Sequence, residues 1–460
     1  MSKKLIKKSK VIVNKFGGGI MIRDYIYLAL ERVQEQIKKG YKPVIVVSAL
    51  KGVTDELIAI FLKISELTKK IENSSNAESL IQESVKIIRA KHMDMIDFLD
   101  FKQEIYDKLL RKFDKIYDKL YNDLVTINRF GMLNIFQDRI LSYGEKMSAL
   151  LFANFLKNNG LNAKRYKAEN IPIITDNTCL DANINYDISE KNVRKIDLGK
   201  NIPVIAGFTG KNKKGNTTTL GRGGTDTTAC FIASAMRAEK VVLWKDVDGV
   251  LSADPRIVDG ARTIDYLSYT EAEESGKVIH DKAIQYVKMF DIKLEVASIL
   301  DPKKKTVVGP ANKIDKGAKI VSFKENLCLL VITDGGVSNY GFLNKITEIF
   351  NVYKINMVLI RNTRDSLQIV VERNNELEKA IKSLEELNYD IIDQEVSMVM
   401  LIGSLNWDMV SEFNLSLAKK CRDPQIGAFP YKNCVRLEAI VKNDEMKKVM
   451  RELHKVFIRD

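Results

Sequence analysis

Hydrophobic positions at the start of the chain alternate between a strand pattern and a helix pattern. The β-branched run Val11–Phe16 predicts a short buried strand, and three glycines follow it. Residues 24–39 carry a helical pattern that ends at Gly40, and residues 43–48 predict a second strand. A strand, a helix and a strand of these lengths indicate a right-handed crossover within a parallel sheet.

The same mixture continues over the first 300 residues. Residues 56–155 are helical in pattern almost throughout, and another helix is predicted at 226–236. Further strands are predicted at four places: 162–166, 202–206, 240–244 and 292–296. We therefore expect one large α/β domain over residues 1–305.

The rest of the chain has a different rhythm. The order strand, helix, strand, strand, helix occurs about twice after residue 320. This order is typical of ferredoxin-like units, in which two helices cover one face of a small sheet. We expect one such unit over residues 320–395 and a second over residues 396–460.

Composition narrows the class of protein. No apolar run is long enough to cross a bilayer, and the basic N-terminus lacks the apolar core and cleavage site of a signal peptide, so we expect a cytoplasmic protein. The five cysteines are scattered singly, which favours reduced thiols over a zinc site. With only three histidines, a mechanism built on several of them is excluded.

The formal net charge is +13, which could mark a nucleic-acid binder. However, the lysines are spread through amphipathic helices and alternate with acids at helical spacing. We therefore expect a solvated, lysine-rich surface, no nucleic-acid partner and no membrane partner. The charge would also favour the entry of anionic substrates into a cleft.

Lys15 stands at the end of the first predicted strand, directly before the glycines and the next helix. Glycines let phosphate oxygens approach the backbone, and a helix start offers free N–H groups. For a glycine triplet taken alone, an ordinary strand-to-helix turn is the favoured explanation. No Gly-Lys-Ser/Thr ending follows, so the segment is not a Walker loop.

The second glycine cluster, residues 221–226, points more clearly to a ligand. Arg222 stands among three glycines, a threonine run precedes them, and a helical pattern follows. Thr225 or Asp226 could simply cap that helix. An arginine with bare backbone around it is a good fork for a carboxylate or phosphate, and we favour such a site here.

Two further segments carry candidate chemistry. Glu145 lies in an apolar helical stretch after Gly144, a costly helix residue that suggests close approach of another group, and the acid could hold an amino group. Residues 244–256 follow a predicted strand with a glycine turn, which suits a nucleotide pocket. Asp246 and Asp248 imitate part of a calcium loop, but the loop's later glutamate is absent.

These segments together resemble the aspartate kinases of the amino-acid kinase superfamily. The matches keep the family's order and spacing at residues 15–18, 48–55, 142–145, 207–210, 217–226, 244–256 and 277–280. The resemblance implies an amino-acid-kinase-type α/β/α sandwich with a mostly parallel sheet, followed by two ferredoxin-like βαββαβ units of the ACT type. It also implies that the two units can be interleaved, with the last segment of the chain completing the first unit.

The implied reaction transfers the γ-phosphate of ATP to the β-carboxylate of L-aspartate. The product is 4-phospho-L-aspartate, the entry compound for lysine, threonine and methionine synthesis. The attacking carboxylate is ionised at neutral pH, so no general base is needed. Mg²⁺ would bridge the phosphates, without a metal site built by the protein alone. The resemblance further implies a homodimer or higher homo-oligomer, with a possible amino-acid effector at the ACT units.

The resemblance also assigns roles to residues. Lys15 would stabilise the transferred phosphoryl group, and Asp226 would orient this lysine. Arg222 would hold the α-carboxylate of aspartate and Glu145 its ammonium. The implied substrate-binding set is Ser48, Ala49, Thr54, Glu145, Arg222, Gly223 and Thr225. The implied nucleotide-binding set is Lys15, Gly17, Gly18, Lys245, Asp246, Leu251, Asp254, Arg256 and Lys277.

The chain departs from the family pattern at two of these places. Gly19 and Ile20 replace a pair that usually bears hydroxyl groups, and the 271–277 segment is a few residues shorter. These departures motivate one alternative, a catalytically silent amino-acid sensor. A separate alternative within the superfamily is a kinase for another amino acid such as glutamate. The retained Lys15 and Asp226 argue against the sensor, and the tandem C-terminal units argue against the glutamate kinase.

Overall fold

The computed structural model describes residues 10–69, 74–131, 134–166, 173–276, 279–311, 317–333, 341–362, 366–421, 425–427 and 435–458. The chain divides into two compact units. The first comprises Met1–Val250 and Thr263–Ala311, and the second comprises Leu251–Arg262 and Asn312–Asp460. The short segment 251–262, which we had expected within the first domain, thus belongs to the second unit.

An eight-stranded sheet forms the centre of the first unit, in the order β3-β5-β2-β1-β8-β10-β11-β9. Neighbouring strands run parallel except at the β10–β11 pair, as the predicted mostly parallel sheet requires. The strands are β1 (Val11–Phe16), β2 (Lys42–Val47), β3 (Ala163–Tyr166), β5 (Ile202–Ala206), β8 (Lys240–Lys245), β9 (Tyr266–Ser268), β10 (Lys293–Ser298) and β11 (Lys305–Gly309). The central strand β1 is buried at every position, because helices cover such sheets on both faces.

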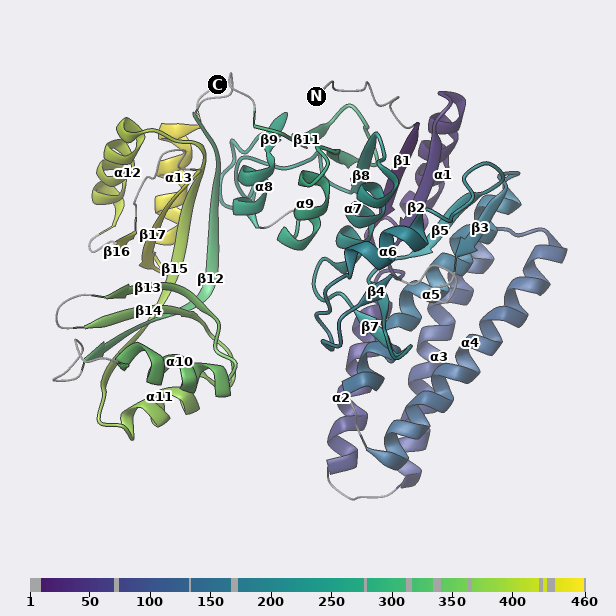
Figure 1. The fold of residues 1–460 in the computed structure, drawn as a ribbon, viewed down its shortest axis with the longest axis horizontal. Helices are drawn as coiled ribbons and strands as arrows, with labels where there is room; N and C mark the ends of the chain where they lie inside the picture. Colours follow the sequence, from purple (N-terminus) through teal and green to yellow (C-terminus); the bar gives the residue numbers. More distant parts are fainter. Residues whose placement is uncertain are drawn as a thin grey trace. The chain divides into compact units, whose positions relative to one another are not determined.

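The helices of the first unit fall into two groups. Long helices α2 to α5 lie side by side as a helical extension (Figure 1), and apolar side chains at helical spacing on α4, such as Leu109, Phe113 and Leu120, join them to the core. The shorter helices lie nearer the sheet. The bounds are α1 (Arg23–Lys38), α2 (Val53–Lys69), α3 (Ser74–Phe98), α4 (Gln103–Phe130), α5 (Asn134–Asn158), α6 (Tyr186–Val193), α7 (Gly224–Met236), α8 (Tyr269–Ser275) and α9 (Asp281–Lys288).

A small second sheet in this unit was not predicted. It has the order β4-β6-β7 and consists of β4 (Ile174–Thr175), β6 (Thr209–Asn212) and β7 (Thr217–Thr219). Its strands are two to four residues long and rich in threonine, too short for a hydrophobic period to be recognised.

The second unit is built on one six-stranded antiparallel sheet in the order β13-β14-β12-β15-β17-β16. Its two longest strands, β12 and β15, are long enough to belong to both halves of the sheet. Helices α10 and α11 pack against one half, and α12 and α13 pack against the other (Figure 1). The bounds are β12 (Gly317–Thr333), α10 (Phe342–Val352), β13 (Met357–Asn362), β14 (Leu367–Glu372), α11 (Leu377–Glu385), β15 (Asp390–Ser404), α12 (Trp407–Lys420), β16 (Gln425–Gly427), β17 (Arg436–Lys442) and α13 (Met446–Phe457).

The two halves of this sheet are interleaved along the chain. Residues 327–332 pair with β14 and complete the half that carries α10 and α11, whereas residues 317–324 pair with the end of β15 in the other half. A shift in register between Lys324 and Leu327 separates the two stretches. The half that carries α12 and α13 therefore combines residues 317–324, which come before the other half in the sequence, with the end of β15 and the segments that follow it.

Candidate active site

A buried ion pair lies at the carboxyl end of the central strands. Lys15 is the second-last residue of β1, and Asp226 lies in the first turn of α7, which packs on β1. Lys15 Nζ is 2.7 Å from Asp226 Oδ1, and Lys245 Nζ, from the end of β8, is 3.6 Å from Oδ2. One carboxylate thus lies between two lysines.

The charges of this trio favour an anionic ligand. Burial alone would raise the pKa of Asp226, but the charges of Lys15 and Lys245 lower it below its ordinary value, so the carboxylate stays ionised. Burial and the charge of Lys15 lower the pKa of Lys245, while Asp226 opposes that shift. Two cations against one anion leave an excess of positive charge. An ionised, lysine-paired aspartate is a poor proton acceptor and a good orienting group.

The first glycine turn lets Lys15 pack closely against the backbone. A Cβ at Gly17 would lie 2.9 Å from Lys15 Nζ, and one at Gly18 would lie 3.3 Å from the carbonyl oxygen of Ala49. Backbone N–H groups of Ile20 and Met21 return to the carbonyl of Gly17, which closes the turn. Larger side chains would displace the lysine or fill the approach to it.

The second glycine cluster forms a tight turn that only glycine permits. Gly221 and Gly223 have φ values of 72° and 73°, in the left-handed region. A Cβ at Gly221 would lie 2.3 Å from Asp181 Oδ1, and one at Gly223 would lie 2.4 Å from the Cβ of His280. Gly223 is also the N-cap of α7. The turn therefore holds Arg222 at the start of this helix.

Glu145 lies on α5 and is almost fully buried, at 3% exposure. Its Oε1 accepts the backbone N–H of Ala49 at 3.2 Å and the hydroxyl of Ser48 at 3.4 Å, while Oε2 is buried with no hydrogen-bond partner among the described residues. Burial raises the pKa of Glu145 to about 7, and the Ala49 hydrogen bond opposes the rise. An unpartnered buried oxygen is costly unless a ligand supplies a donor.

Gly144 permits α5 to pack against the residues that follow β2. A Cβ at this position would lie 2.8 Å from the Cβ of Ala49, which is closer than two non-bonded carbon atoms can approach. The suggestion that Gly144 marks a close approach therefore has a geometric basis.

These groups share one cavity of about 300 Å³. It is lined by Lys15, Ser48, Thr54, Glu145, Phe208, Gly221, Arg222, Gly223, Gly224, Thr225 and Asp226. Lys15 and Arg222 thus face the same space. Ala49 is joined to the site through Glu145, and Asp246 lies across from the first glycine turn, with its Oδ2 3.6 Å from a Cβ built at Gly19.

Three proposed nucleotide-binding residues belong to the second unit, and a fourth is not among the described residues. Leu251, Asp254 and Arg256 are in the segment that belongs to the second unit, where Arg256 forms an ion pair with Asp254 at 2.7 Å. Lys277 lies outside the described residues. Their roles stay predictions.

Phe208 lines the cavity but was given no role from the sequence. Its φ of 66° is unusual for a non-glycine residue, and the hydroxyl of Thr228 accepts its backbone N–H at 3.0 Å. A helix residue thus fixes the strained turn that follows β5. Its position between Gly207 and Gly210 was the available signal.

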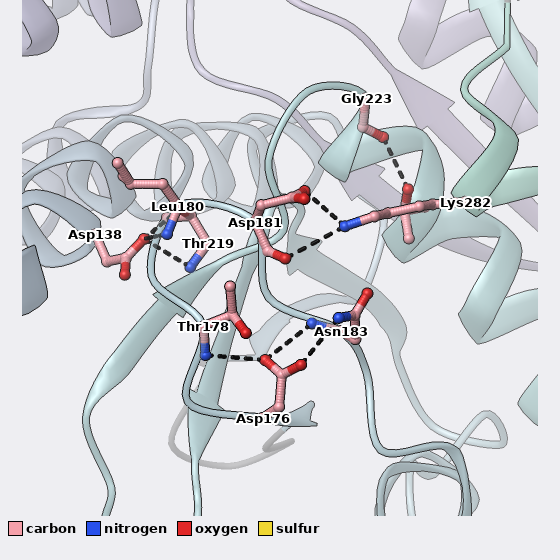
Figure 2. Close-up of polar contacts among 10 residues, drawn as sticks. Asp138, Asp176, Thr178, Leu180, Asp181, Asn183, Thr219, Gly223 and Lys282 are labelled. Carbon is pink, nitrogen blue, oxygen red and sulfur yellow. Dashed lines mark hydrogen bonds and ion pairs between the residues drawn. The ribbon is translucent and has the colours of Figure 1, made fainter. Parts of the chain in front are cut away.

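A loop at residues 176–183 supports the Arg222 turn from behind and was also missed. Figure 2 shows Asp181, which accepts hydrogen bonds from Lys282 through its side chain at 2.6 Å and its carbonyl at 3.3 Å. Asp138 accepts the N–H groups of Leu180 and Thr219, both at 3.0 Å, and so ties this loop to β7. These contacts join residues far apart in sequence, so periodicity could not reveal them.

The described residues contain no cluster of three histidine, cysteine or acidic side chains placed to hold a metal ion. Every helix in the described part of the chain is too short or too polar to span a bilayer.

Comparison with known proteins identifies the group to which these features belong. The sequence model of the amino acid kinase family matches residues 10–298. Aspartokinase 2, chloroplastic, of Arabidopsis thaliana is 28% identical, covering 98% of this chain and 85% of that protein. Aspartokinase of Rickettsia felis is 26% identical, covering 97% and 99%.

Solved structures show the same fold. The crystal structure of E. coli aspartokinase III in complex with lysine and aspartate superposes with a TM-score of 0.80 at 22% identity, covering 98% of this chain and 100% of that one. The Clostridium acetobutylicum aspartate kinase gives a TM-score of 0.73 at 21% identity, covering 97% and 100%. The predicted fold class, a kinase-type α/β domain followed by ferredoxin-like units, is confirmed.

Proposed function

The chain belongs to the amino acid kinase family, and we infer that within this family it is an aspartate kinase. It transfers the γ-phosphoryl group of ATP to the β-carboxylate of L-aspartate and releases ADP and 4-phospho-L-aspartate. This acyl phosphate would serve the synthesis of lysine, threonine and methionine. An enzyme that consumes ATP and free aspartate is expected to act in the cytoplasm.

The observation that carries this proposal is the single cavity that Lys15, Glu145 and Arg222 share. An amino acid has one ammonium and one α-carboxylate to be recognised, and Glu145 and Arg222 supply the opposite charges. Ser48, Thr54 and Thr225 would complete the pocket with hydroxyl groups, and Ala49 and Gly223 with backbone. The β-carboxylate would then point toward Lys15.

The chemistry needs no proton acceptor. A β-carboxylate oxygen attacks the γ-phosphorus, the new C–O–P bond forms, and the bond to the β-phosphate oxygen breaks with ADP as the leaving group. Catalysis then consists of positioning two anions and stabilising charge on the transferring group, which suits the excess of lysine around Asp226. Mg²⁺, carried by the nucleotide, would neutralise part of the phosphate charge.

The nucleotide would lie along the carboxyl ends of β1 and β8. Gly17, Gly18, Lys245 and Asp246 are the proposed contacts in the first unit. Leu251, Asp254, Arg256 and Lys277 remain in the proposal on the strength of the family resemblance alone.

We extend the proposal to regulation and assembly. The E. coli aspartokinase III structure contains lysine and covers 98% of this chain, and this supports an amino-acid effector at the interleaved second unit. Paired ACT units would also support a homodimer or a higher homo-oligomer.

The test is a coupled ADP-release assay with aspartate or glutamate, in which hydroxylamine traps any acyl phosphate as a hydroxamate. We expect aspartate-dependent ADP release with matching hydroxamate, and a loss of about 100-fold or more in Lys15→Ala. Lys240→Ala is the matched control. Lys240, like Lys15, forms an ion pair, but it lies at the start of β8, whereas the site is at the end of β8 with Lys245. No turnover with any amino acid would favour the silent sensor, and a preference for glutamate would favour the related kinase.

A further inference from the structure

The first unit has a second pocket, formed by α4, α5 and the start of β3. Its volume is about 410 Å³, within the range of small-molecule sites. Ile116, Leu150 and Ala153 supply apolar surface, and Tyr143 and Asn154 add polar groups. None of the lining residues also lines the proposed catalytic cavity.

The pocket is strongly cationic. Its remaining lining residues are all basic: Lys112, Lys115, Lys119, Lys146, Lys157, Lys164 and Arg165. No aspartate or glutamate is among the described residues that line it. Like charges that line one pocket repel one another, and salt screens this repulsion only in part. Such a set is most stable when an anion occupies the space between them.

The basic residues converge because two helices present the same face to each other. Lys112, Lys115 and Lys119 recur at helical spacing on α4, and Lys146 and Lys157 lie three turns apart on one face of α5. The two helices pack together, and β3 adds Lys164 and Arg165. A solvated lysine face on a single helix would not enclose a pocket in this way.

Two acids on α4 form ion pairs with arginines that do not line the pocket. Asp123, on the same helix as three of these lysines, accepts the hydroxyl of Tyr143 at 2.6 Å and pairs with Arg139 at 2.8 Å. Asp114 pairs with Arg89. Lys115, Lys119, Lys157 and Lys164 form no ion pair with a carboxylate in the part of the chain that the structure describes.

This pattern contrasts with other lysines of the same unit, such as Lys91 with Glu56 and Lys282 with Asp181, which do find acids. Lys115, Lys119, Lys157 and Lys164 are therefore available to an external counter-ion.

We propose that this pocket binds a small anion with several phosphate groups, either an inorganic polyphosphate or the phosphate chain of a nucleotide. An extended row of ammonium groups matches a chain of phosphates better than a single compact anion. The guanidinium of Arg165 adds donors in a planar fork that suits phosphate oxygens. A pocket of about 410 Å³ favours a small molecule over a polymer.

The probe for a test is tripolyphosphate, titrated calorimetrically into the full chain at low and at physiological salt. In Lys115→Ala/Lys119→Ala/Lys157→Ala, we expect the dissociation constant to rise about tenfold or more. The matched control is Lys63→Ala/Lys86→Ala/Lys191→Ala, which removes the same charge from exposed positions outside the pocket and should change the constant by less than about twofold. Equal losses in both variants would mean non-specific attraction, and no binding to the wild type would also overturn the proposal.

Lysine acetylation footprinting locates the bound anion independently of affinity. Tripolyphosphate should protect Lys115, Lys119 and Lys157 from acetylation, whereas protection of Lys15 and Lys245 alone would place the anion in the catalytic cavity and refute the proposal. A nucleoside triphosphate titrated in parallel separates the two phosphate sources. A hexaglutamate peptide that binds as tightly as tripolyphosphate would show that the pocket does not select phosphate.

Discussion

The carboxylate of Glu145 accepts the backbone N–H of Ala49 at 3.2 Å, and this bond fixes one oxygen while the other stays buried without a partner among the described residues. It joins the middle of α5 to the segment that follows β2. The carboxylate of Glu145 is therefore held in place before any ligand binds. Its protonation state in the ligand-free protein is determined by its burial.

Aspartate binding should depend on pH through Glu145. Burial raises its pKa to about 7, and only the ionised form can hold the substrate ammonium. The KM for aspartate should therefore rise as pH falls from about 8 to about 6, approaching a tenfold change per pH unit below the pKa. Steady-state kinetics across this range check the effect. In Glu145→Gln the KM should be high and independent of pH, whereas Glu104→Gln, an exposed acid on α4, should behave like the wild type.

The same group should make stability depend on pH. The pKa in the folded state lies above the ordinary value of 4.5, so the folded chain holds the proton more tightly than the unfolded chain. The protonated Glu145 therefore stabilises the fold fully below about pH 4.5, and this stabilisation is lost as pH rises to about 7. The total change in the free energy of unfolding is on the order of 3 kcal/mol. Denaturant titrations at several pH values give the free energy of unfolding, which should fall more steeply between about pH 4.5 and 7 in the wild type than in Glu145→Gln. Parallel curves for the two proteins would contradict the assignment.

The close packing at Gly144 predicts an unusual response to alanine. Gly→Ala within a helix normally stabilises by about 1 kcal/mol. Here the new Cβ would lie 2.8 Å from that of Ala49, so we expect Gly144→Ala to cost about 1–3 kcal/mol and to displace Glu145. Thermal denaturation and the KM for aspartate measure the two effects. Adding Ala49→Gly removes the opposing carbon and should restore much of both, and an additive double mutant would exclude a direct clash.

Sequence patterns predicted the parts of the fold that local burial controls. The strand expected at Val11–Phe16 is β1, because a parallel strand buried on both faces reads as a continuous apolar run. The small sheet and the 176–183 loop could not be predicted, since Asp138 reaches Thr219 across 81 positions. The membership of residues 251–262 in the second unit likewise depends on tertiary contacts such as Val321 with Ser252.

Asp138 should be a structural requirement of the site. Its Oδ1 accepts backbone N–H groups of Leu180 and Thr219, so Asp138→Ala would leave buried donors without partners, at a cost of about 1–3 kcal/mol for each. We expect a lower Tm and weaker aspartate binding, because the loop supports the Arg222 turn through Gly221. Asp138→Asn retains an oxygen acceptor and should lose much less. Equal losses in the two variants would point to charge rather than hydrogen bonding.

His454 contacts the 251–262 segment within the second unit: its Nε2 lies 2.9 Å from the hydroxyl oxygen of Ser252. That hydroxyl also accepts the N–H of Arg262, and Arg451 donates to the carbonyl of Ile257, so helix α13 holds the segment 251–262 at its start and at its middle. Because Leu251, Asp254 and Arg256 are proposed to contact the nucleotide, loosening this segment should raise the KM for ATP several-fold and leave the KM for aspartate nearly unchanged. His454→Ala should show this split, and His454→Gln, which can still form the hydrogen bond, should show less of it. If both KM values rise together in His454→Ala, the substitution has disturbed the whole chain, and the proposed nucleotide role of the segment loses its support.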